Sequence, residues 1–385
     1  MQSYGRLDDY LDAEGLDGYL IDADGTNADQ RYLSGYDAPD PYRTLYRSDG
    51  ISLFVKSLEY GRAKTDSDGD AVRRPTEYGV EAYADRDADH DALAAFLEEF
   101  DAEAVGVPDR FPAGTADALR ERGVTVEPDA EGVVADIRAV KSEDEIDEIR
   151  AAQRANESAM EAAQALIADA TIDGDQLVHD GEVLTSERVK TVIERELLEH
   201  GYALDETIVA GGAQGADPHN RGSGPLPAHT PIVIDVFPRS KATRYHADMT
   251  RTFVRGTASE EVRERFELTK EALEAALAAI EPGVTGEAVH NEVCDVYEAA
   301  GHPTLRSDES TETGFFHSTG HGVGLEIHEG PRVGPGGVEL EAGHVVTIEP
   351  GLYNPEPGGM RLEDLVVVRE AGYENLTEYP FTLEL

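Results

Sequence analysis

The sequence of 385 residues contains no tryptophan, a single cysteine (Cys294) and only six lysines. One cysteine cannot form a disulfide within the chain, which favours a reducing cytoplasm. No run approaches the roughly 18 apolar residues of a membrane-spanning helix. The opening stretch MQSYGRLDDYLDAEG lacks the basic head and apolar core of a secretory signal. These absences predict a cytoplasmic protein that does not enter the membrane and is long enough for two domains.

Acidic charge dominates the composition. The chain has 79 Asp plus Glu against 33 Lys plus Arg, for a formal net charge of −46. Such a field repels nucleic acid and anionic membranes. A disordered acidic protein and a folded protein adapted to molar salt both fit this charge. The apolar content of 40% and the even spread of acids favour the folded, halophilic interpretation. Any single acid is therefore a solvated surface group by default.

The first part of the chain, residues 1–140, reads as an α/β domain. Short apolar runs alternate there with helical patterns. The expected strands lie near 19–21 and 51–55, and the expected helices near 6–14 and 90–100. The polar stretch 57–75 contains glycines and is expected to form a loop or hairpin tip.

A second domain is predicted over residues 141–385. Ser142 and Glu145 form a capping-box pattern, and apolar residues at helical spacing follow it, so a long helix should open this domain. The insert 172–187 is expected to be a loop with an exposed His179. The later elements are expected as helices near 187–200, 260–280 and 286–299 and as strands near 207–211, 231–236 and 246–254.

The stretch HSTGHGVGLEIHEGP, residues 317–331, holds three of the twelve histidines: His317, His321 and His328. A spacing of four would place the first two on one helix face. Three nearby glycines, however, each cost a helix about 1 kcal/mol. The stretch is therefore predicted to be a strand or loop where backbones approach closely.

Four acids adjoin apolar runs. They are Asp235 in PIVIDVF, Asp248 in YHADMTRTFV, Glu349 in HVVTIEPGLY and Glu363 in GGMRLEDLVVV. A buried carboxylate is costly unless it is paired or binds a cation. For any one of them a hydrogen-bonded structural role is as good an interpretation as a ligand role. Together with the histidine cluster, they would be explained by two divalent cations, of Mn²⁺, Fe²⁺, Co²⁺ or Zn²⁺, that activate one shared water.

The ordered set Asp235, Asp248, His321, Glu349 and Glu363 resembles the five-ligand signature of the pita-bread metallopeptidases, which include methionine aminopeptidase, aminopeptidase P and prolidase. The segments DIRAVKSEDEIDEIR and NADQRYLSGY are similar to segments of the proline-specific members. The resemblance implies an α/β N-terminal domain followed by an α+β pita-bread catalytic domain. It also implies that Asp235 chelates one metal with both oxygens, that Asp248 and Glu363 bridge the pair, and that His321 and Glu349 complete the second metal.

The same resemblance implies roles for residues around the metals. Glu349 would also take the proton from the attacking water, and His328 would contact the tetrahedral intermediate. His219, in GADPHN, resembles the other substrate-facing histidine of the family. His317 and Arg361 match positions typical of the proline-specific members, where Arg361 joins the catalytic set and His317 shapes the substrate pocket. Tyr353 would hydrogen-bond nearby.

The expected function is hydrolysis of Xaa-Pro bonds in short peptides by a metal-bridged hydroxide, as an aminopeptidase or a dipeptidase. The resemblance also implies a homodimer, with Mn²⁺ as the foremost metal. Two alternatives are a creatinase-like hydrolase that works without metal and a non-enzymatic binding module on the same fold. The intact ligand set argues against both. One departure from the family pattern is Asp235-Val236-Phe237-Pro238 in place of Asp-x-Gly, with a longer gap to Asp248, so the connecting hairpin should be extended.

The other histidines are interpreted conservatively. His246 lies two residues before Asp248 and would share its strand face, which makes it a candidate to line the cleft. Cys294 is expected in the core or between helices. The histidines expected to be surface or capping groups are His90, His200, His290, His302 and His344.

Overall fold

A computed structural model describes residues 4–81 and 86–385 of the chain. The chain divides into two compact units, Met1–Arg138 and Ala139–Leu385. Residues 1–3 and 82–85, which belong to the predicted 1–140 domain, lie outside the described residues. Within the described ranges, no helix combines the length and apolarity needed to cross a membrane.

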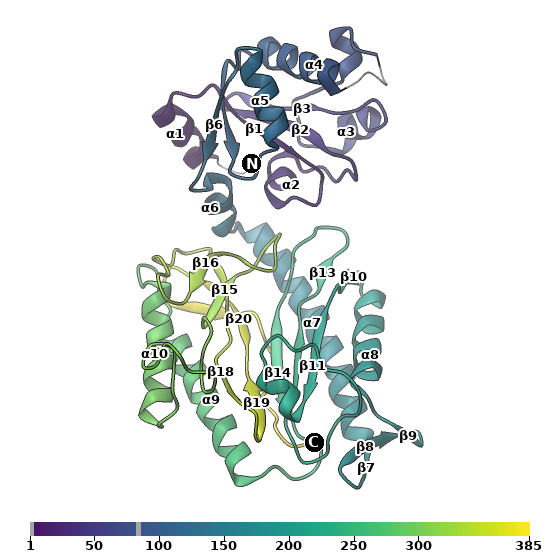
Figure 1. Ribbon diagram of the computed structural model, residues 1–385, viewed down its shortest axis with the longest axis vertical. Coiled ribbons are helices and arrows are strands. Elements are labelled where there is room, and N and C mark those ends of the chain that lie inside the picture. The colour runs from purple at the N-terminus through teal and green to yellow at the C-terminus, as the bar shows by residue number, and fades with distance from the viewer. Residues whose placement is uncertain (1–3, 82–85) are drawn as a thin grey trace. The chain divides into compact units, whose positions relative to one another are not determined.

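The first unit is built on one sheet in the order β4-β3-β2-β1-β5-β6 (Figure 1). Its strands are β1 (Gly18–Ala23), β2 (Tyr42–Arg47), β3 (Gly50–Phe54), β4 (Ala71–Arg73), β5 (Ala104–Pro108) and β6 (Thr125–Asp129). Its helices are α1 (Gly5–Glu14), α2 (Ala28–Ser34), α3 (Tyr60–Asp66), 3₁₀ helix η1 (Pro75–Tyr78), α4 (Arg86–Glu99), α5 (Ala113–Glu121) and α6 (Val133–Ala139). Leu93, Phe96 and Leu97 of α4 pack with Val105 and Val107 of β5, so the apolar stripe of the helix covers the sheet.

The expectation of a loop over 57–75 is wrong in part. Helix α3 and strand β4 lie within this stretch, and β4 pairs in parallel with β3 at the edge of the sheet. Only Val72 of β4 is fully buried. A three-residue edge strand with one buried side chain is too short to produce a readable alternation.

The second unit opens with helix α7 (Glu143–Asp169), and its capping box is confirmed. The Ser142 backbone N–H donates to Glu145 Oε2 at 2.8 Å, and the Glu145 N–H donates back to Ser142 Oγ at 3.4 Å. Two of the free N–H groups at this helix start are thereby satisfied.

Two helix pairs cover two sheets in the second unit (Figure 1). Helices α7 and α8 (Ser186–Glu199) share a core with the strands β11 (Thr207–Gly211), β12 (Ile232–Val236) and β14 (Met249–Phe253). Helices α9 (Glu260–Ala278) and α10 (Gly286–Ala299) pack on the sheet β16-β15-β17-β20-β21. That sheet consists of β15 (Gly320–Gly322), β16 (Glu329–Val333), β17 (Val345–Ile348), β20 (Asp364–Val368) and β21 (Tyr373–Asn375).

Shorter elements complete the second unit. They are the β18 (Gly351–Asn354) and β19 (Gly358–Arg361) hairpin, the β10 (Tyr202–Ala203) and β13 (Arg239–Ser240) pair, the 3₁₀ helix η2 (Gly212–Ala216), and the sheet of β7 (Thr171–Asp173), β8 (Gln176–His179) and β9 (Glu182–Val183). The last sheet corrects the expected loop at 172–187. Asp180 and Gly181 both have positive φ, 57° and 77°, as the two central residues of a type I′ hairpin turn do. The dipeptide Asp-Gly was therefore the signal for a hairpin here, and the sequence interpretation missed it. His179 is correspondingly part-buried, with Nε2 3.2 Å from Asp169 Oδ2.

The glycine-rich histidine segment was expected to be a strand or a loop, and it contains a strand, β15. A Cβ on Gly320 would lie 1.8 Å from the carbonyl oxygen of Thr347, and one on Gly322 would lie 1.9 Å from that of Gly330. Only glycine allows this approach. The close spacing holds His321 between its neighbouring strands β16 and β17.

Candidate metal centre

Five candidate ligands come from five strand ends of the second unit. Asp235 lies in β12, Asp248 directly precedes β14, and His321 lies in β15. Glu349 directly follows β17, and Glu363 lies between β19 and β20. Antiparallel pairing sets β12 beside β14 and β17 beside β20. The Glu363 N–H donates to the carbonyl oxygen of Thr250 at 3.1 Å, which joins the two pairs across 113 positions of sequence.

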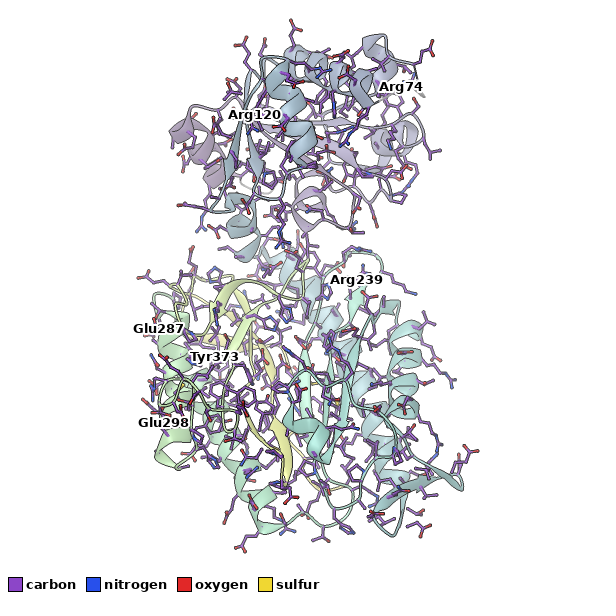
Figure 2. All side chains as sticks on the ribbon, in the orientation of Figure 1. Arg74, Arg120, Arg239, Glu287, Glu298 and Tyr373 are labelled. Atoms are coloured by element: carbon purple, nitrogen blue, oxygen red, sulfur yellow. The ribbon has the colours of Figure 1, made fainter. Side chains whose placement is uncertain are left out.

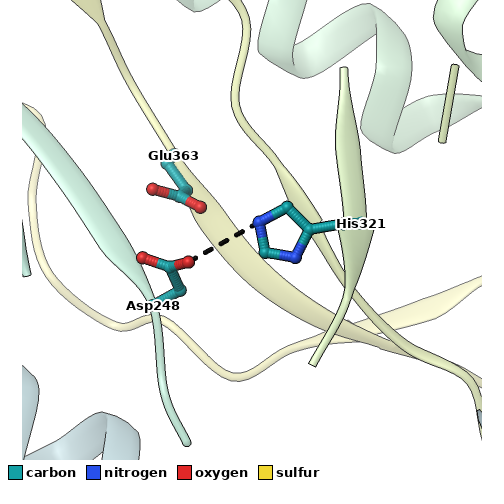
Figure 3. Close-up of side chains that lie close together, drawn as sticks. All are labelled: Asp248, His321 and Glu363. Atoms are coloured by element: carbon teal, nitrogen blue, oxygen red, sulfur yellow. Dashed lines mark ion pairs between the residues drawn. The ribbon is translucent and has the colours of Figure 1, made fainter. Parts of the chain in front are cut away.

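Three of these side chains, those of Asp248, His321 and Glu363, face one another (Figure 3). Ligand atoms of Asp248, His321 and Glu363 all lie within 4.8 Å of one another. His321 Nε2 lies 3.7 Å from Asp248 Oδ2 and 3.4 Å from Glu349 Oε1. Asp235 lies close enough for its charge to raise the pKa of Asp248, Glu349 and Glu363. The structure thus gathers all five residues around one centre.

The protonation of the carboxyl groups reports crowding of like charge. Burial raises the pKa of Asp248 well above its usual range, and the charges of Glu363, Asp235 and Glu349 raise it further. Burial and the charges of Glu349 and Asp235 do the same to Glu363, and burial raises the pKa of Glu349 to about 8. Four carboxyl groups in a low-dielectric site cannot all ionise without a cation among them.

Unsatisfied oxygens and the donor set both fit divalent metal. In the part of the chain that the structure describes, Oδ1 of Asp235 and Oδ1 of Asp248 are buried without a hydrogen-bond partner. Buried acceptors left in this way are costly unless a ligand completes them. Carboxylate oxygens with one imidazole match the preferences of Mn²⁺, Fe²⁺, Co²⁺ and Zn²⁺.

His321 is oriented for a ligand role. Its Nδ1 lies 3.1 Å from the carbonyl oxygen of Gly322, which accepts only from an N–H, so Nε2 is the unprotonated nitrogen that faces the acids. Burial, together with the charge of His328, lowers the pKa of His321 to about 4. The imidazole is therefore neutral at pH 7, the form that can coordinate metal.

A buried arginine network flanks the acids. Arg361 Nη2 donates to Asp235 Oδ2 at 2.6 Å, and Arg361 Nη1 donates to the Tyr353 hydroxyl at 3.2 Å. The same hydroxyl lies 2.9 Å from His317 Nε2. Burial and the charge of Arg361 lower the pKa of His317 to about 3, so this histidine is neutral. The family resemblance implies that both carboxylate oxygens of Asp235 bind one metal. In this structure one of them, Oδ2, accepts a hydrogen bond from Arg361.

The remaining two candidate residues lie at the open side of the centre. His328 is exposed, and its ring meets His321 edge-on with centroids 4.3 Å apart. His219 is also exposed and follows η2, and its charge lowers the pKa of both His317 and His328. Both imidazoles are thereby placed where a substrate can reach them.

Two threonines that the sequence interpretation missed hold Glu363 and Arg361 in place. Thr250 Oγ1 donates to Glu363 Oε2 at 2.7 Å and accepts from Arg361 Nε at 3.1 Å. Thr252 Oγ1 donates to the carbonyl oxygen of Arg361 at 2.9 Å. The alternation in Met249-Thr250-Arg251-Thr252 was the available signal, because residues two apart on a strand share a face.

Three histidines expected at the surface are buried, which corrects that expectation. His90, His290 and His344 have 6%, 6% and 5% of their surface exposed. His290 Nδ1 lies 2.9 Å from Thr319 Oγ1, two residues before His321, and its Nε2 lies 3.5 Å from Cys294 Sγ. The expected core position of Cys294 is confirmed.

We expect metal-free protein to lose stability as pH rises from about 7 to about 8.5. Folding raises the pKa of Glu349 from 4.5 to about 8, so the folded state holds a proton that the unfolded state has lost. Stability then falls by about 1.4 kcal/mol per pH unit until the pH passes the folded-state pKa of about 8, and it levels off above that pH. Buried histidines oppose this only below about pH 6.5, where the unfolded chain takes up protons.

The measurement is the thermal midpoint with a chelator across that pH range. Glu349→Gln should flatten the decline, and the exposed control Glu370→Gln should keep it. A midpoint that does not change with pH in wild-type protein would contradict the like-charge account.

A clustered acid–histidine centre on paired strand ends defines a candidate metallohydrolase. Residues 147–370 match the model of Metallopeptidase family M24, and residues 4–140 match the Creatinase/Prolidase N-terminal domain. The chain belongs to Metallopeptidase family M24. The predicted fold class, an α/β N-terminal domain followed by a pita-bread domain, is confirmed.

Similar proteins extend over nearly the whole chain. A Xaa-Pro dipeptidase of Pyrococcus horikoshii is 29% identical over 378 residues, which cover 97% of this chain and 96% of that protein. The crystal structure of a prolidase from Pyrococcus horikoshii has a TM-score of 0.80 at 26% identity and covers 99% of both chains. An X-Pro aminopeptidase from Thermotoga maritima has a TM-score of 0.78 at 26% identity, with 96% and 98% covered. The chain is therefore similar to both dipeptide-cleaving and aminopeptidase members.

Proposed function

We propose that this chain hydrolyses Xaa-Pro bonds in short peptides with two divalent metal ions held by Asp235, Asp248, His321, Glu349 and Glu363. The observation that carries the proposal is the convergence of Asp248, His321 and Glu363 within 4.8 Å. The names of the similar proteins supply the substrate class. Mn²⁺ is our first choice of metal, with Co²⁺, Zn²⁺ and Fe²⁺ also compatible with this donor set.

The residues around the proposed metals divide the work of hydrolysis. When bound, such ions lower the pKa of water and polarise a carbonyl. Glu349 accepts a proton at its carboxylate, beside His321. His328 and His219, on the exposed side, donate hydrogen bonds to the oxyanion that develops on the substrate.

The arginine network positions the centre and borders the substrate. Arg361 offsets the charge of Asp235 and fixes the Tyr353 hydroxyl, which in turn orients His317. A peptide bond before proline has no N–H, so it must be recognised by shape. In the proposed pocket the part-buried His317 borders the substrate. The buried rings of Phe315 and Tyr353 pack against it, with centroids 4.9 and 5.3 Å from the centroid of its ring.

The test is a peptide-cleavage time course by mass spectrometry in molar KCl with Mn²⁺. The substrates are Ala-Pro, Ala-Pro-Ala, Met-Ala-Ala and Ala-Ala-Ala, and a chelated sample is the control. Chelator-sensitive cleavage of Ala-Pro alone makes the enzyme a dipeptidase, and cleavage of Ala-Pro-Ala makes it an aminopeptidase. Cleavage of neither by folded, metal-loaded protein would contradict the proposal.

A halophilic origin and a homodimer also belong to the proposal. The charge of −46 supports the first, and the family resemblance supports the second. Exposed Glu287, near the start of α10, exemplifies the acidic surface, and part-buried Glu298, near the end of the same helix, pairs with Arg306 (Figure 2).

We expect activity and thermal midpoint to rise together between about 0.1 and 2 M KCl. Screening shortens the range of self-repulsion from about 10 Å to a few ångströms. The check is kcat and midpoint in KCl and NaCl series, with sucrose as an uncharged control that should not substitute. Highest activity at the lowest salt would contradict the halophilic inference.

A further inference from the structure

A buried lysine lies near the start of the second unit, far in sequence from the candidate ligands. The Lys141 side chain is 1% exposed and the Glu329 side chain, to which its Nζ donates, is 4% exposed. Lys141 Nζ also donates to the carbonyl oxygen of Ala139 at 3.2 Å, and its backbone N–H donates to that of Gly343 at 2.9 Å. The ammonium is thus held from both its backbone and its side chain.

Glu329 closes the turn between β15 and β16. Its Oε2 accepts from the Glu326 N–H at 3.3 Å, while its backbone pairs with Gly322 across the two strands. A Cβ on Gly324 would lie 2.3 Å from Glu329 Oε1, so the carboxylate sits directly against the backbone of the turn. The His246 N–H donates to the carbonyl oxygen of Gly324 at 2.9 Å, so the segment that precedes β14 also holds the turn.

The two histidines of the centre lie at the ends of this turn. His321 precedes it in β15, and His328 directly precedes Glu329. Their rings meet at 4.3 Å between centroids with an interplanar angle of 78°. A change in the path of residues 323–328 would alter that geometry.

A buried ion pair is a poor source of stability. The desolvation of both charges offsets most of their attraction, and an apolar pair of similar volume often stabilises a fold equally well. The geometry here suggests a different reason for its presence, because Glu329 bonds the turn as well as the lysine.

We propose that Lys141 and Glu329 are positioning residues for the hydrolytic reaction: the ammonium fixes the Glu329 carboxylate, and the carboxylate fixes the turn that sets His328 against His321. The inference rests on the proposed function, since it assigns the pair a role in that reaction. Neither residue contacts the reacting atoms. Their effect is exerted through the backbone of the turn.

The test compares Lys141→Met with the apolar double variant Lys141→Met/Glu329→Leu. The single variant removes the ammonium from beside the buried Glu329 carboxylate, so its thermal midpoint should fall, and the double variant should recover most of that fall. Both should lose about 10- to 100-fold in kcat for the best substrate with little change in KM. Lys270→Met, which removes an exposed lysine 3.8 Å from Glu274, is the matched control and should match wild type.

A second readout does not need activity. Histidine-selective ¹⁵N NMR of chelated protein should show shifted imidazole signals for His321 and His328 in the double variant, and unchanged signals for the distant His200. Recovery of wild-type kcat together with the midpoint in the double variant would overturn the positioning role and leave a structural pair. Wild-type protein that cleaves no Xaa-Pro peptide would instead sink the proposed function, and the NMR comparison would still decide whether the pair sets the imidazole geometry.

Discussion

Replacement of Glu349 by glutamine should lower kcat for the best Xaa-Pro substrate by about 10³-fold or more. Glu349 Oε1 lies 3.4 Å from His321 Nε2, at the centre of the acid cluster. The amide keeps one oxygen as a possible ligand but cannot accept a proton, so activity should fall more than metal content. The measurements are kcat, KM and metal content by elemental analysis of the same sample.

The exposed Glu370→Gln is the control for a lost carboxylate in a protein with a charge of −46. It should retain wild-type kcat. Metal loss parallel to activity loss in Glu349→Gln would reduce the role of Glu349 to that of a ligand. Full metal content with more than about a tenth of the wild-type kcat would contradict a role in proton transfer.

The candidate centre could be found from sequence because of where its acids stand. Asp235 terminates Ile232-Val233-Ile234, and Glu349 follows Val345-Val346-Thr347-Ile348, so each acid had to be buried or at a strand end. Burial of a carboxylate costs free energy unless a positive charge lies beside it, so a buried acid with no basic residue nearby in sequence indicates a bound cation. Strand ends of antiparallel pairs then bring these positions together, as β12 with β14 and β17 with β20 show.

The partners of those acids could not be found in the same way. Thr250 reaches Glu363 across 113 positions, and Arg361 reaches Asp235 across 126. Periodicity describes which face a side chain occupies, but it does not say which other strand lies opposite. Lys141, whose partner Glu329 lies 188 positions away, was hidden for the same reason.

His290 was a different kind of error, because the signal was local. The buried residues Val289, His290, Val293, Cys294 and Tyr297 recur at helical spacing along α10, so His290 lies on the core face of that helix. The expectation of a surface position rested on the polarity of the imidazole and not on the place of His290 in the helical pattern. Burial lowers the pKa of His290 to about 4, and its neutral ring bonds Thr319, so a core position costs little.

The acid cluster and the arginine beside it are best understood together. The charge of Asp235 raises the pKa of Asp248, Glu349 and Glu363, and the charge of Arg361 lowers the pKa of the same three groups. In the described second unit this guanidinium is 3% exposed and donates to Asp235, Tyr353 and Thr250. It therefore partly neutralises the centre whether or not metal is bound. Metal and arginine should thus compensate for each other in stability.

Arg361→Met should destabilise chelated protein by about 3–5 kcal/mol, because it leaves the charge of Asp235 buried without its partner. The same variant should gain more stability from added Mn²⁺ than wild type does, since the cations then supply the only positive charge beside Asp235. Arg361→Lys should recover part of the loss, because an ammonium keeps the charge but not the fork that reaches Asp235, Tyr353 and Thr250 at once. Denaturant unfolding with chelator and with Mn²⁺ measures these differences.

The double variant Arg361→Met/Asp235→Asn separates charge from packing. If the loss in Arg361→Met arises from an unpaired carboxylate, removal of that carboxylate should restore much of the stability of the chelated protein, while the Mn²⁺-dependent gain shrinks because a ligand is gone. If the loss arises from the missing bonds of Arg361 to Tyr353 and Thr250, the double variant should be as unstable as the single one. Equal instability of the two variants would mean that Arg361 stabilises the hairpin of β18 and β19 through its hydrogen bonds. The proposed compensation between metal and arginine would then be wrong.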